Sequence, residues 1–318
     1  MTRVAVCAPH FVRYPMLGDL CETLRERYDE VVFSDQVPRL DGDDLIAFLK
    51  GCDKAVTCLE VLDDSVFSAV PEMRVVSKVG VGLDMIDLEA MARHGVELGW
   101  QGGINKRSVA ELTLQFFLAI LRHVPAANRE VLDGIWRRQT GRQLTGKTVG
   151  IIGCGHIGKD LTRLLKPFEC RVLANDIRDY PDFYQAHDVE PVGLEELLTE
   201  SDIVTLHVPL DASTRGMLTA ELLALMKPTA YLVNAARGGL LDEDALTAML
   251  KDGRLAAAAL DVFAVEPPPN TELLRLPNFL ATPHIGGSAE EALRDIGVAA
   301  VDGLDAARLP DDNWPIGG

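Results

Sequence analysis

Three ionisable side chains follow short apolar runs late in the chain: Arg237, Glu266 and His284. At a strand end, an arginine can form two hydrogen bonds to a carboxylate, although its position alone leaves a surface ion pair open. His284 lies between a proline and Ile-Gly-Gly, eighteen residues past Glu266. A histidine beside a carboxylate forms an acid/base unit, because the negative charge favours imidazolium and orients the ring. We therefore expect a site that binds an anion and moves a proton.

A glycine motif in the middle of the chain predicts a dinucleotide site. Gly153, Gly155 and Gly158 follow the apolar residues 149–152 with GxGxxG spacing. The first glycine permits a tight turn, the second lets the backbone approach a pyrophosphate, and the third lets helix pack on strand. The start of the following helix offers unpaired N–H groups to the phosphates.

Asp176 indicates which dinucleotide to expect. It lies eighteen residues past Gly158, after a second apolar run. That spacing is close to that of an acid that accepts hydrogen bonds from the adenosine ribose. Because its charge would repel a 2′-phosphate, we expect the cofactor NAD rather than NADP.

Short apolar runs alternate with amphipathic stretches along the chain, which is typical of parallel sheets covered by helices. The two predicted series of strands are 4–8, 31–33, 55–59, 75–79 and 96–98, and then 149–153, 171–175, 203–208, 230–234, 257–262 and 279–282. Two series predict an α/β protein with two doubly wound domains. A helix at 289–307 would return the chain to the first, so we expect a discontinuous substrate-binding domain (1–100 and 286–318) around an NAD-binding domain (101–285).

The helix predicted at 108–121 is apolar on all its faces. Ser108 is its expected N-cap, with Glu111 at capping-box spacing. A helix that is apolar all round is buried, between domains or between subunits. With the segment through Trp136, it has more apolar surface than one domain face needs. A homodimer is expected, since two-fold pairing is the commonest way to bury such a surface.

Composition excludes several classes of partner. The net charge of −17 disfavours nucleic acid and anionic membranes, and no apolar stretch approaches the length of a membrane span. The N-terminus continues into amphipathic sequence without a cleavage site and is interpreted as a first strand. The six cysteines form no CxxC pair and no cluster with histidines, so we expect no metal site and no disulfide framework. The cytoplasm is the expected compartment.

Seven segments between residues 75 and 287 resemble one family, the D-isomer-specific 2-hydroxyacid dehydrogenases. They are Lys78-Val-Gly-Val-Gly-Leu-Asp-Met-Ile-Asp87, Ser108-Val-Ala-Glu111, Gly153–Gly158, Asp202-Ile-Val-Thr-Leu-His-Val-Pro-Leu210, Asn234-Ala-Ala-Arg-Gly238, Asp261-Val-Phe-Ala-Val-Glu-Pro267 and Thr282-Pro-His-Ile-Gly286. The resemblance implies a Rossmann domain inserted into a flavodoxin-like substrate domain. It also implies hydride transfer between NAD(H) and C2 of a D-2-hydroxy acid or 2-keto acid.

The resemblance also implies roles for individual residues. Arg237 would bind the substrate carboxylate, and His284 would be the general acid/base with Glu266 as its partner. The turn Gly80-Val81-Gly82 would offer N–H groups to the same carboxylate. The implied cofactor contacts are Gly153, Gly155, His156, Ile157, Gly158, Asp176, His207, Val208, Pro209, Thr214, Ala235, Ala236, Asp261 and Gly287.

Other functions stay open beside this one. Corepressors of the C-terminal-binding-protein type share the fold and bind NAD as sensors. Phosphite dehydrogenase keeps the Arg, Glu and His pattern, but it has Lys where this chain has Val81. Formate dehydrogenase is disfavoured, since it has Gln at the position of Glu266.

The substrate is not named by any motif. The pair Lys106-Arg107, in a loop that departs from the family pattern, predicts a preference for a second anionic group if it faces the substrate. A solvated pair before a helix is the alternative. Near strand ends of the first domain, His10, Arg13, Leu59 and Glu60 are candidates for a side-chain pocket, although the sequence favours a structural or solvated role for each.

Overall fold

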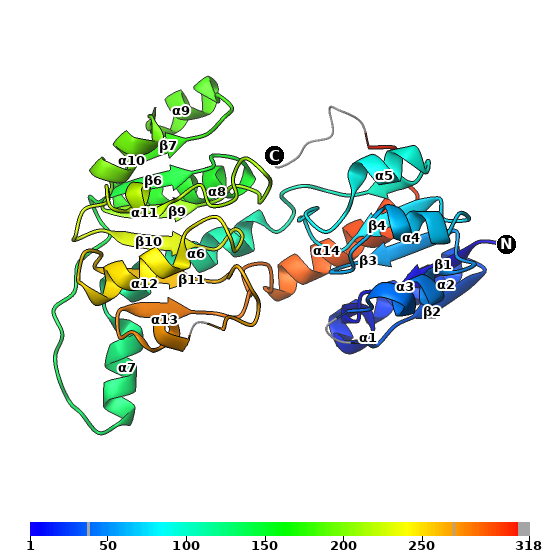
Figure 1. The fold of residues 1–318 in the computed structure, drawn as a ribbon, viewed down its shortest axis with the longest axis horizontal. Coiled ribbons are helices and arrows are strands. Elements are labelled where there is room, and N and C mark those ends of the chain that lie inside the picture. Colours follow the sequence, from blue (N-terminus) through cyan, green and yellow to red (C-terminus); the bar gives the residue numbers. More distant parts are fainter. Residues whose placement is uncertain (37–38, 270, 311–318) are drawn as a thin grey trace. The chain divides into compact units, whose positions relative to one another are not determined.

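A computed structural model describes residues 1–36, 39–269 and 271–310, and the chain divides into two compact units (Figure 1). Within the described residues, unit 1 comprises Met1–Asn105 and the chain from Gly287 onward, and unit 2 comprises Lys106–Gly286. The boundaries expected at 100/101 and 285/286 lie five residues and one residue before these divisions.

Unit 1 contains a five-stranded parallel sheet with the order β2-β1-β3-β4-β5. Its strands are β1 (Arg3–Val6), β2 (Glu30–Phe33), β3 (Lys54–Thr57), β4 (Val75–Lys78) and β5 (Glu97–Gly99). Its helices are α1 (His10–Arg13), the 3₁₀ turn η1 (Pro15–Leu17), α2 (Gly18–Arg27), α3 (Gly42–Leu49), α4 (Asp64–Ala69), α5 (Leu88–Arg93) and α14 (Glu290–Gly303). The central strands are short apolar runs buried on both faces, as parallel strands covered by helices require.

Unit 2 contains a seven-stranded parallel sheet with the order β12-β11-β10-β9-β6-β7-β8. Its strands are β6 (Thr148–Ile152), β7 (Arg171–Asn175), β8 (Val189–Pro191), β9 (Ile203–Leu206), β10 (Tyr231–Asn234), β11 (Ala257–Leu260) and β12 (Phe279–Ala281). Its helices are α6 (Lys106–Leu121), α7 (Val124–Leu132), α8 (His156–Leu165), the 3₁₀ turn η2 (Lys166–Phe168), α9 (Pro181–His187), α10 (Leu194–Glu200), α11 (Ala220–Leu223), α12 (Glu243–Lys251) and α13 (Thr271–Arg275).

The strand orders confirm the predicted fold class. Unit 1 has the flavodoxin-like order, and unit 2 has the doubly wound Rossmann order extended by one strand. In unit 2 the order reverses at β6, which lies between β7 and β9. Ligands of such sheets bind outside the carboxyl ends of the strands at this reversal, which is where the GxGxxG segment follows β6.

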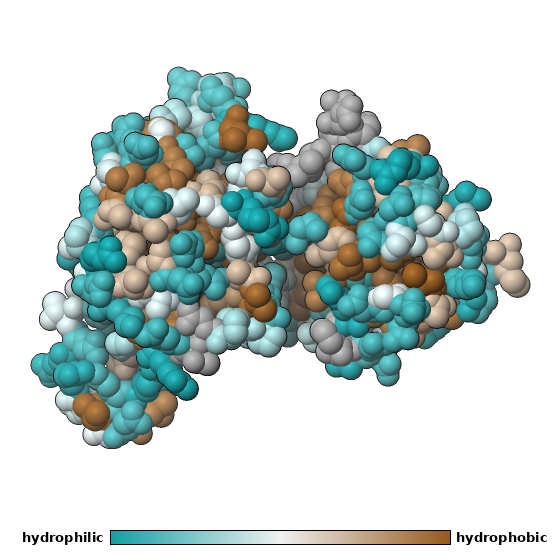
Figure 2. Space-filling view, viewed as in Figure 1, coloured by the Kyte–Doolittle hydropathy of each residue, from teal (hydrophilic) through white to brown (hydrophobic). Residues whose placement is uncertain are grey.

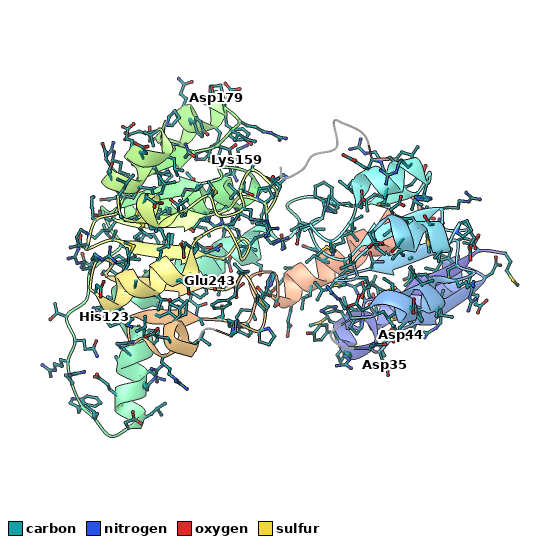
Figure 3. The ribbon with its side chains drawn as sticks, in the orientation of Figure 1. Asp35, Asp44, His123, Lys159, Asp179 and Glu243 are labelled. Carbon is teal, nitrogen blue, oxygen red and sulfur yellow. The ribbon has the colours of Figure 1, made fainter. Side chains whose placement is uncertain are left out.

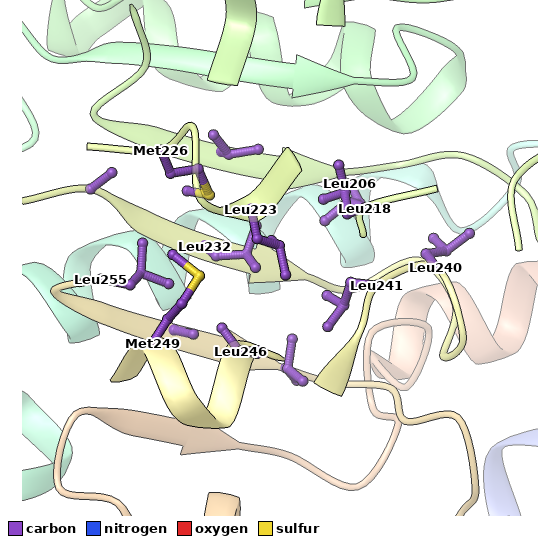
Figure 4. Close-up of a cluster of buried hydrophobic side chains, with 14 of the residues drawn as sticks. Leu206, Leu218, Leu223, Met226, Leu232, Leu240, Leu241, Leu246, Met249 and Leu255 are labelled. Atoms are coloured by element: carbon purple, nitrogen blue, oxygen red, sulfur yellow. The ribbon is translucent and has the colours of Figure 1, made fainter. Parts of the chain in front are cut away.

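Both faces of the unit 2 sheet are buried, because successive side chains of each strand enter different cores. Leu232 of β10 packs with Leu223 of α11, with Met226 just after that helix, and with leucines and Met249 of α12 (Figure 4). Its neighbours Tyr231 and Val233 pack on the opposite face with Phe116 and Phe117 of α6. This alternation explains why continuous apolar runs form the central strands.

Helix α6 differs from its prediction at its start. It begins at Lys106, and the Ser108 hydroxyl donates to the carbonyl of Gly286 at 2.6 Å, so the prediction of Ser108 as N-cap was wrong. Val109, Phe116 and Phe117 are buried within unit 2, but Glu111, Gln115 and Leu118 are exposed on its other side. The prediction of a helix that is apolar and buried all round was therefore wrong. Among the described residues, no single helix is long and apolar enough to cross a membrane, and only the bent pair α6 and α7 meets that length and composition together.

Close backbone contact joins α14 to the sheet of unit 1. A Cβ atom on Gly99 would lie 2.5 Å from the carbonyl carbon of Gly303 and 2.8 Å from its Cα. Only a residue without a Cβ lets the last turn of α14 approach β5 this closely. These two glycines therefore allow the C-terminal helix to complete the domain begun by the N-terminus.

We predict that Gly99→Ala lowers the free energy of unfolding by about 1–3 kcal/mol, the usual effect of overpacking. Denaturant titration measures this change. Gly18→Ala is the matched control, because Gly18 is exposed at the start of α2 and its Cβ would meet nothing within 4 Å. Equal stability of the two variants would contradict the close packing of α14.

Candidate active site

Asp261 directly follows β11 and holds the turn that carries His284. Its Oδ1 accepts hydrogen bonds from the Thr282 hydroxyl at 2.5 Å and the Ile285 N–H at 2.8 Å, and its Oδ2 accepts from the Gly286 N–H at 2.7 Å. Its backbone carbonyl accepts from the His284 N–H at 2.8 Å. The residue is 1% exposed. Because β11 and β12 are adjacent and parallel, their carboxyl ends meet, and one carboxylate can bind the whole turn.

His284 has an unusual backbone conformation. Its φ is +55°, in the left-handed region that non-glycine residues rarely adopt. Such a residue persists only where surrounding contacts hold it, and the hydrogen bonds to Asp261 supply those contacts. The ring is thereby presented at the end of β12, half-exposed.

The His284 ring is paired with Glu266, as the sequence predicted. Its Nδ1 lies 2.8 Å from Glu266 Oε2, with both side chains partly exposed. With Nδ1–H donating to the carboxylate, Nε2 is left to face a reactant. A pocket of about 390 Å³ opens beside the pair, lined mainly by apolar groups such as Phe263 and Leu274.

Two further contacts fix the loop that carries Glu266. The Phe263 N–H donates to Glu266 Oε1 at 3.0 Å, and the Ala264 N–H donates to the carboxylate of Glu243 at 2.7 Å. Glu243 begins α12, where Figure 3 labels it. Burial raises the pKa of Glu266, but the hydrogen bonds from His284 and Phe263 and the charges of His284 and Arg237 together lower it below its ordinary value. The carboxylate is therefore ionised at neutral pH.

Arg237 lies near this pair, in a turn folded by Asn234. The Asn234 side chain accepts from the Ala236 N–H at 3.0 Å and donates to the Arg237 carbonyl at 2.7 Å. Gly238 allows the turn to touch the Glu266 loop, since a Cβ there would lie 2.5 Å from Ala264 N. One guanidinium nitrogen donates to the Ala236 carbonyl at 2.8 Å. The structure thus brings together the three residues that the sequence nominated for chemistry.

The glycine loop has the geometry of a phosphate cradle. A Cβ on Gly153 (φ +93°) would lie 2.6 Å from the His207 carbonyl oxygen, and one on Gly158 would clash with the Gly153 carbonyl. Gly155 is the N-cap of α8 and supplies no side-chain hydrogen bond to the first turn. The first N–H groups of this helix have no acceptor within it, so they are available to an anion.

Asp176 connects the glycine loop to the end of β7. Its Oδ2 accepts from the Cys154 N–H at 2.7 Å, and its Oδ1 accepts from the Arg178 N–H at 2.8 Å. Each carboxylate oxygen keeps a second lone pair that a ribose hydroxyl can use. Lys159, which Figure 3 labels on α8, lies over the Tyr180 ring with its Nζ 3.3 Å from the ring centroid.

The other expected cofactor residues of unit 2 lie along the same edge. His156 and Ile157 begin α8, and burial, followed by the charges of Lys106 and Lys159, lowers the pKa of His156. Burial lowers the pKa of His207 to about 3, so its ring is neutral. The remaining ones are Val208, Pro209 and Thr214 after β9, and the buried Ala235 and Ala236 after β10. Thr214 uses its hydroxyl within its own turn, donating to the Pro209 carbonyl at 2.7 Å.

Four expected residues belong to unit 1. Gly80 (φ +103°), Val81 and Gly82 follow β4, and the Trp100 indole donates to the Val81 carbonyl at 3.1 Å. Gly287 lies beside Asn105, whose side-chain nitrogen would be 3.0 Å from a Cβ on that glycine. The turn after β4 begins at Gly80, whose positive φ is permitted without strain because glycine has no Cβ.

Arg107, the second residue of the pair Lys106-Arg107, forms an ion pair within unit 2. Arg107 binds Asp160 of α8 through Nε at 3.0 Å and Nη2 at 3.1 Å, and the Asp160 side chain is 5% exposed. The guanidinium therefore neutralises a buried carboxylate inside unit 2. This ion pair favours a structural role for Arg107 over the reading of a second substrate anion.

Some contacts that build the site were not predicted from the sequence, although Thr282 itself lies in one of the segments that resemble the family. The Glu243 carboxylate accepts a hydrogen bond from the Ala264 N–H, and the Thr282 hydroxyl donates one to the Asp261 carboxylate. Each partner is 21 residues away in the sequence. Asn105 has a buried Oδ1 without a partner among the described residues. Long-range polar contacts of this kind appear only once the fold is known.

Comparisons with known proteins agree with this geometry. The model of the D-isomer specific 2-hydroxyacid dehydrogenase NAD binding domain matches residues 114–286. The chain is 37% identical to hydroxypyruvate reductase of Thermotoga maritima over 274 residues, 83% of this chain and 87% of that protein. It is 40% identical to D-3-phosphoglycerate dehydrogenase of Methanocaldococcus jannaschii over 240 residues, 74% of this chain but 46% of that protein, so it spans about half of that relative.

A solved structure extends the comparison over nearly the whole chain. The TT0316 protein of Thermus thermophilus is 31% identical, with a TM-score of 0.83, and the match covers 98% of this chain and 99% of that one. The NAD binding domain of the family corresponds to unit 2, with its glycine cradle, and NAD is the cofactor. The chain belongs to the D-isomer specific 2-hydroxyacid dehydrogenases, a family of oxidoreductases.

Proposed function

We propose that this chain transfers a hydride between NAD(H) and C2 of a D-2-hydroxy acid or 2-keto acid, with unit 2 binding NAD and unit 1 binding substrate. The observation that carries the proposal is the 2.8 Å contact between His284 Nδ1 and Glu266 Oε2, at a strand end of the NAD-binding unit. Similarity to hydroxypyruvate reductase over most of both chains supports a small 2-keto acid as substrate.

His284 moves the proton in this proposal. In reduction, the imidazolium gives its Nε2 proton to the C2 oxygen, and in oxidation the neutral ring takes the hydroxyl proton back. Glu266 stabilises the imidazolium and fixes the ring through Nδ1. NAD supplies the hydride chemistry when bound, and the protein supplies orientation and charge.

Arg237 binds the substrate carboxylate, which its guanidinium fork matches with two hydrogen bonds. The turn Gly80-Val81-Gly82 contributes backbone N–H groups to the same carboxylate. For the cofactor, the first N–H groups of α8 would hold the pyrophosphate, and the Asp176 carboxylate would accept hydrogen bonds from the adenosine ribose. That carboxylate repels a 2′-phosphate, which favours NAD over NADP.

We also propose a homodimer built on unit 2. Helix α7 and the segment after it extend away from the sheet of unit 2, and hydrophobic side chains are visible on this extension (Figures 1 and 2). Exposed fractions are large for its apolar residues: Val124 52%, Val131 52%, Leu132 78%, Ile135 51% and Trp136 84%. An exposed apolar patch of this kind marks an interface, and two-fold pairing would bury it twice.

The first prediction from this proposal concerns His284→Ala. We expect kcat for the NADH-dependent reduction of glyoxylate to fall by ~10²–10⁴-fold, the usual contribution of a positioned acid/base group. Affinity for NADH, measured by fluorescence titration, should be nearly unchanged. Near-normal turnover in the variant would remove His284 from the mechanism, whereas NADH binding without turnover by the unaltered protein would favour a sensor.

The second prediction concerns pH. Reduction needs the imidazolium form of His284, so the rate of reduction should fall as pH rises. Oxidation needs the neutral ring, so the rate of oxidation should rise over the same pH range. Glu266→Gln removes the charge that favours imidazolium, so both pH profiles should move to lower pH. An exposed control, Glu272→Gln, should leave them in place. Profiles that stay unmoved in Glu266→Gln would rule out Glu266 as the charge partner.

The third prediction concerns assembly. Light scattering at micromolar concentration should give twice the 34.6 kDa mass of the chain. Leu132→Glu should shift the mass to that of the monomer, because a buried unpaired charge opposes association. Val12→Glu, at a residue of unit 1 that is 54% exposed, should leave the dimer intact. A monomeric unaltered protein would reject the proposed interface.

A further inference from the structure

Polar groups gather at the carboxyl edge of the unit 1 sheet, where three adjacent strands end. His10 follows β1, Glu60 follows β3, and Lys78 ends β4. Glu60 is 1% exposed and Lys78 is 5% exposed. This is the edge at which sheets of this topology bind ligands, so buried ionisable groups here need an explanation.

Two of these side chains have an atom without a partner in the described part of the chain. Glu60 Oε2 accepts from the Cys58 N–H at 2.6 Å, which closes the turn after β3, but Glu60 Oε1 is buried with no hydrogen bond. His10 Nδ1 is also buried without one. Native structures rarely leave buried polar atoms unpaired, and a purely structural turn would need only one oxygen of Glu60.

The three groups are close enough to act on one another. Burial has the largest effect on the pKa of His10 and lowers it, but the charge of Glu60 raises it, and those of Lys78 and Arg13 lower it. Lys78 Nζ donates to the carbonyls of Cys58 and Val79. It also lies 4.0 Å from the position of a Cβ on Gly80, so the cluster adjoins the turn assigned to the substrate carboxylate.

The charges of the cluster select one kind of ligand. Because Glu60 and Lys78 affect His10 with opposite charges, the pair has no net charge, and an ion of either sign that is attracted by one of them is repelled by the other. A neutral hydroxyl satisfies both constraints, because it donates to Glu60 Oε1 and accepts from the His10 ring or from Lys78.

We propose that Glu60, together with His10 and Lys78, binds a hydroxyl group on the carbon next to the keto group of the substrate. This inference rests on the proposed function and specifies its substrate class: a 2-keto acid with an unphosphorylated 3-hydroxyl. Glu60 is its specificity residue, since its unpaired oxygen accepts from that hydroxyl. A methyl group in the same place leaves this oxygen without a hydrogen bond. A phosphate there is repelled by the negative charge of Glu60.

The test compares kcat/KM for hydroxypyruvate, pyruvate, 3-phosphohydroxypyruvate and glyoxylate with NADH. Hydroxypyruvate should be preferred to pyruvate by the unaltered protein. In Glu60→Gln its kcat/KM should fall about tenfold, as for the loss of one hydrogen bond to a charged group. Glyoxylate, which has no substituent, should change less than about twofold, since it lacks that hydrogen bond. The phosphorylated acid should gain relative to hydroxypyruvate as the repelling charge is removed.

Glu97→Gln, at the amino end of β5 in the same sheet, is the matched control and should leave every ratio unchanged. An unchanged ratio of hydroxypyruvate to pyruvate in Glu60→Gln, with glyoxylate still reduced, would overturn the inference. If that variant does not fold, product inhibition of the unaltered protein decides: D-glycerate should inhibit more strongly than D-lactate, and equal inhibition would overturn it.

Failure of the proposed function gives a different result, since no 2-keto acid, glyoxylate included, would then be reduced. The thermal shift caused by each acid needs no turnover. A larger rise in Tm with D-glycerate than with D-lactate, lost in Glu60→Gln, would support the hydroxyl site even then. Equal shifts would overturn it.

Discussion

The hydrogen bonds accepted by the buried carboxylate of Asp261 are the constraint on which the site depends. They hold Thr282, Ile285 and Gly286, and thus the left-handed turn of His284, against the end of β11. Without them, a histidine with positive φ would relax to an ordinary conformation, and its ring would leave Glu266. The acid/base pair is therefore a product of strand order, because only neighbouring parallel strands bring Asp261 under the turn after β12.

Most of the fold was predictable because each parallel strand is a short apolar run bounded by turn residues. The prediction missed β8, Val189–Pro191, an edge strand whose last two residues are exposed and which ends in proline. Only Val189 of this strand is buried, so it lacks the continuous apolar run that marks a central strand. Its proline is tolerated because an edge strand leaves one row of backbone groups unpaired. The start of α6 was wrong for another reason: the Ser108 hydroxyl, typical of an N-cap, bonds to Gly286, which is distant in the sequence.

The candidate site likewise consists of residues that could be predicted from the sequence and supporting contacts that could not. Glycine spacing and strand-end polar residues nominated Gly153, Arg237, Glu266 and His284, since these motifs are local in the sequence. The supports of these residues were not predictable, because Asp261 acts through three backbone or hydroxyl donors more than twenty residues away. The unpaired oxygen of Glu60 is likewise a property of packing, and no pattern of residue types reveals it.

The hydrogen bond between Ser108 and Gly286 has a consequence for the ancestry of the molecule. It joins the first and last turns of unit 2, so this unit begins and ends at one place. In unit 1, Asn105 and Gly287 flank each other as well, at the point where the chain leaves and returns. A domain whose ends meet can enter a loop of another without stretching either. The structure is therefore compatible with an origin by insertion of one complete domain, unit 2, into a loop of another, unit 1. Each unit can then change in sequence without disturbing the fold of the other.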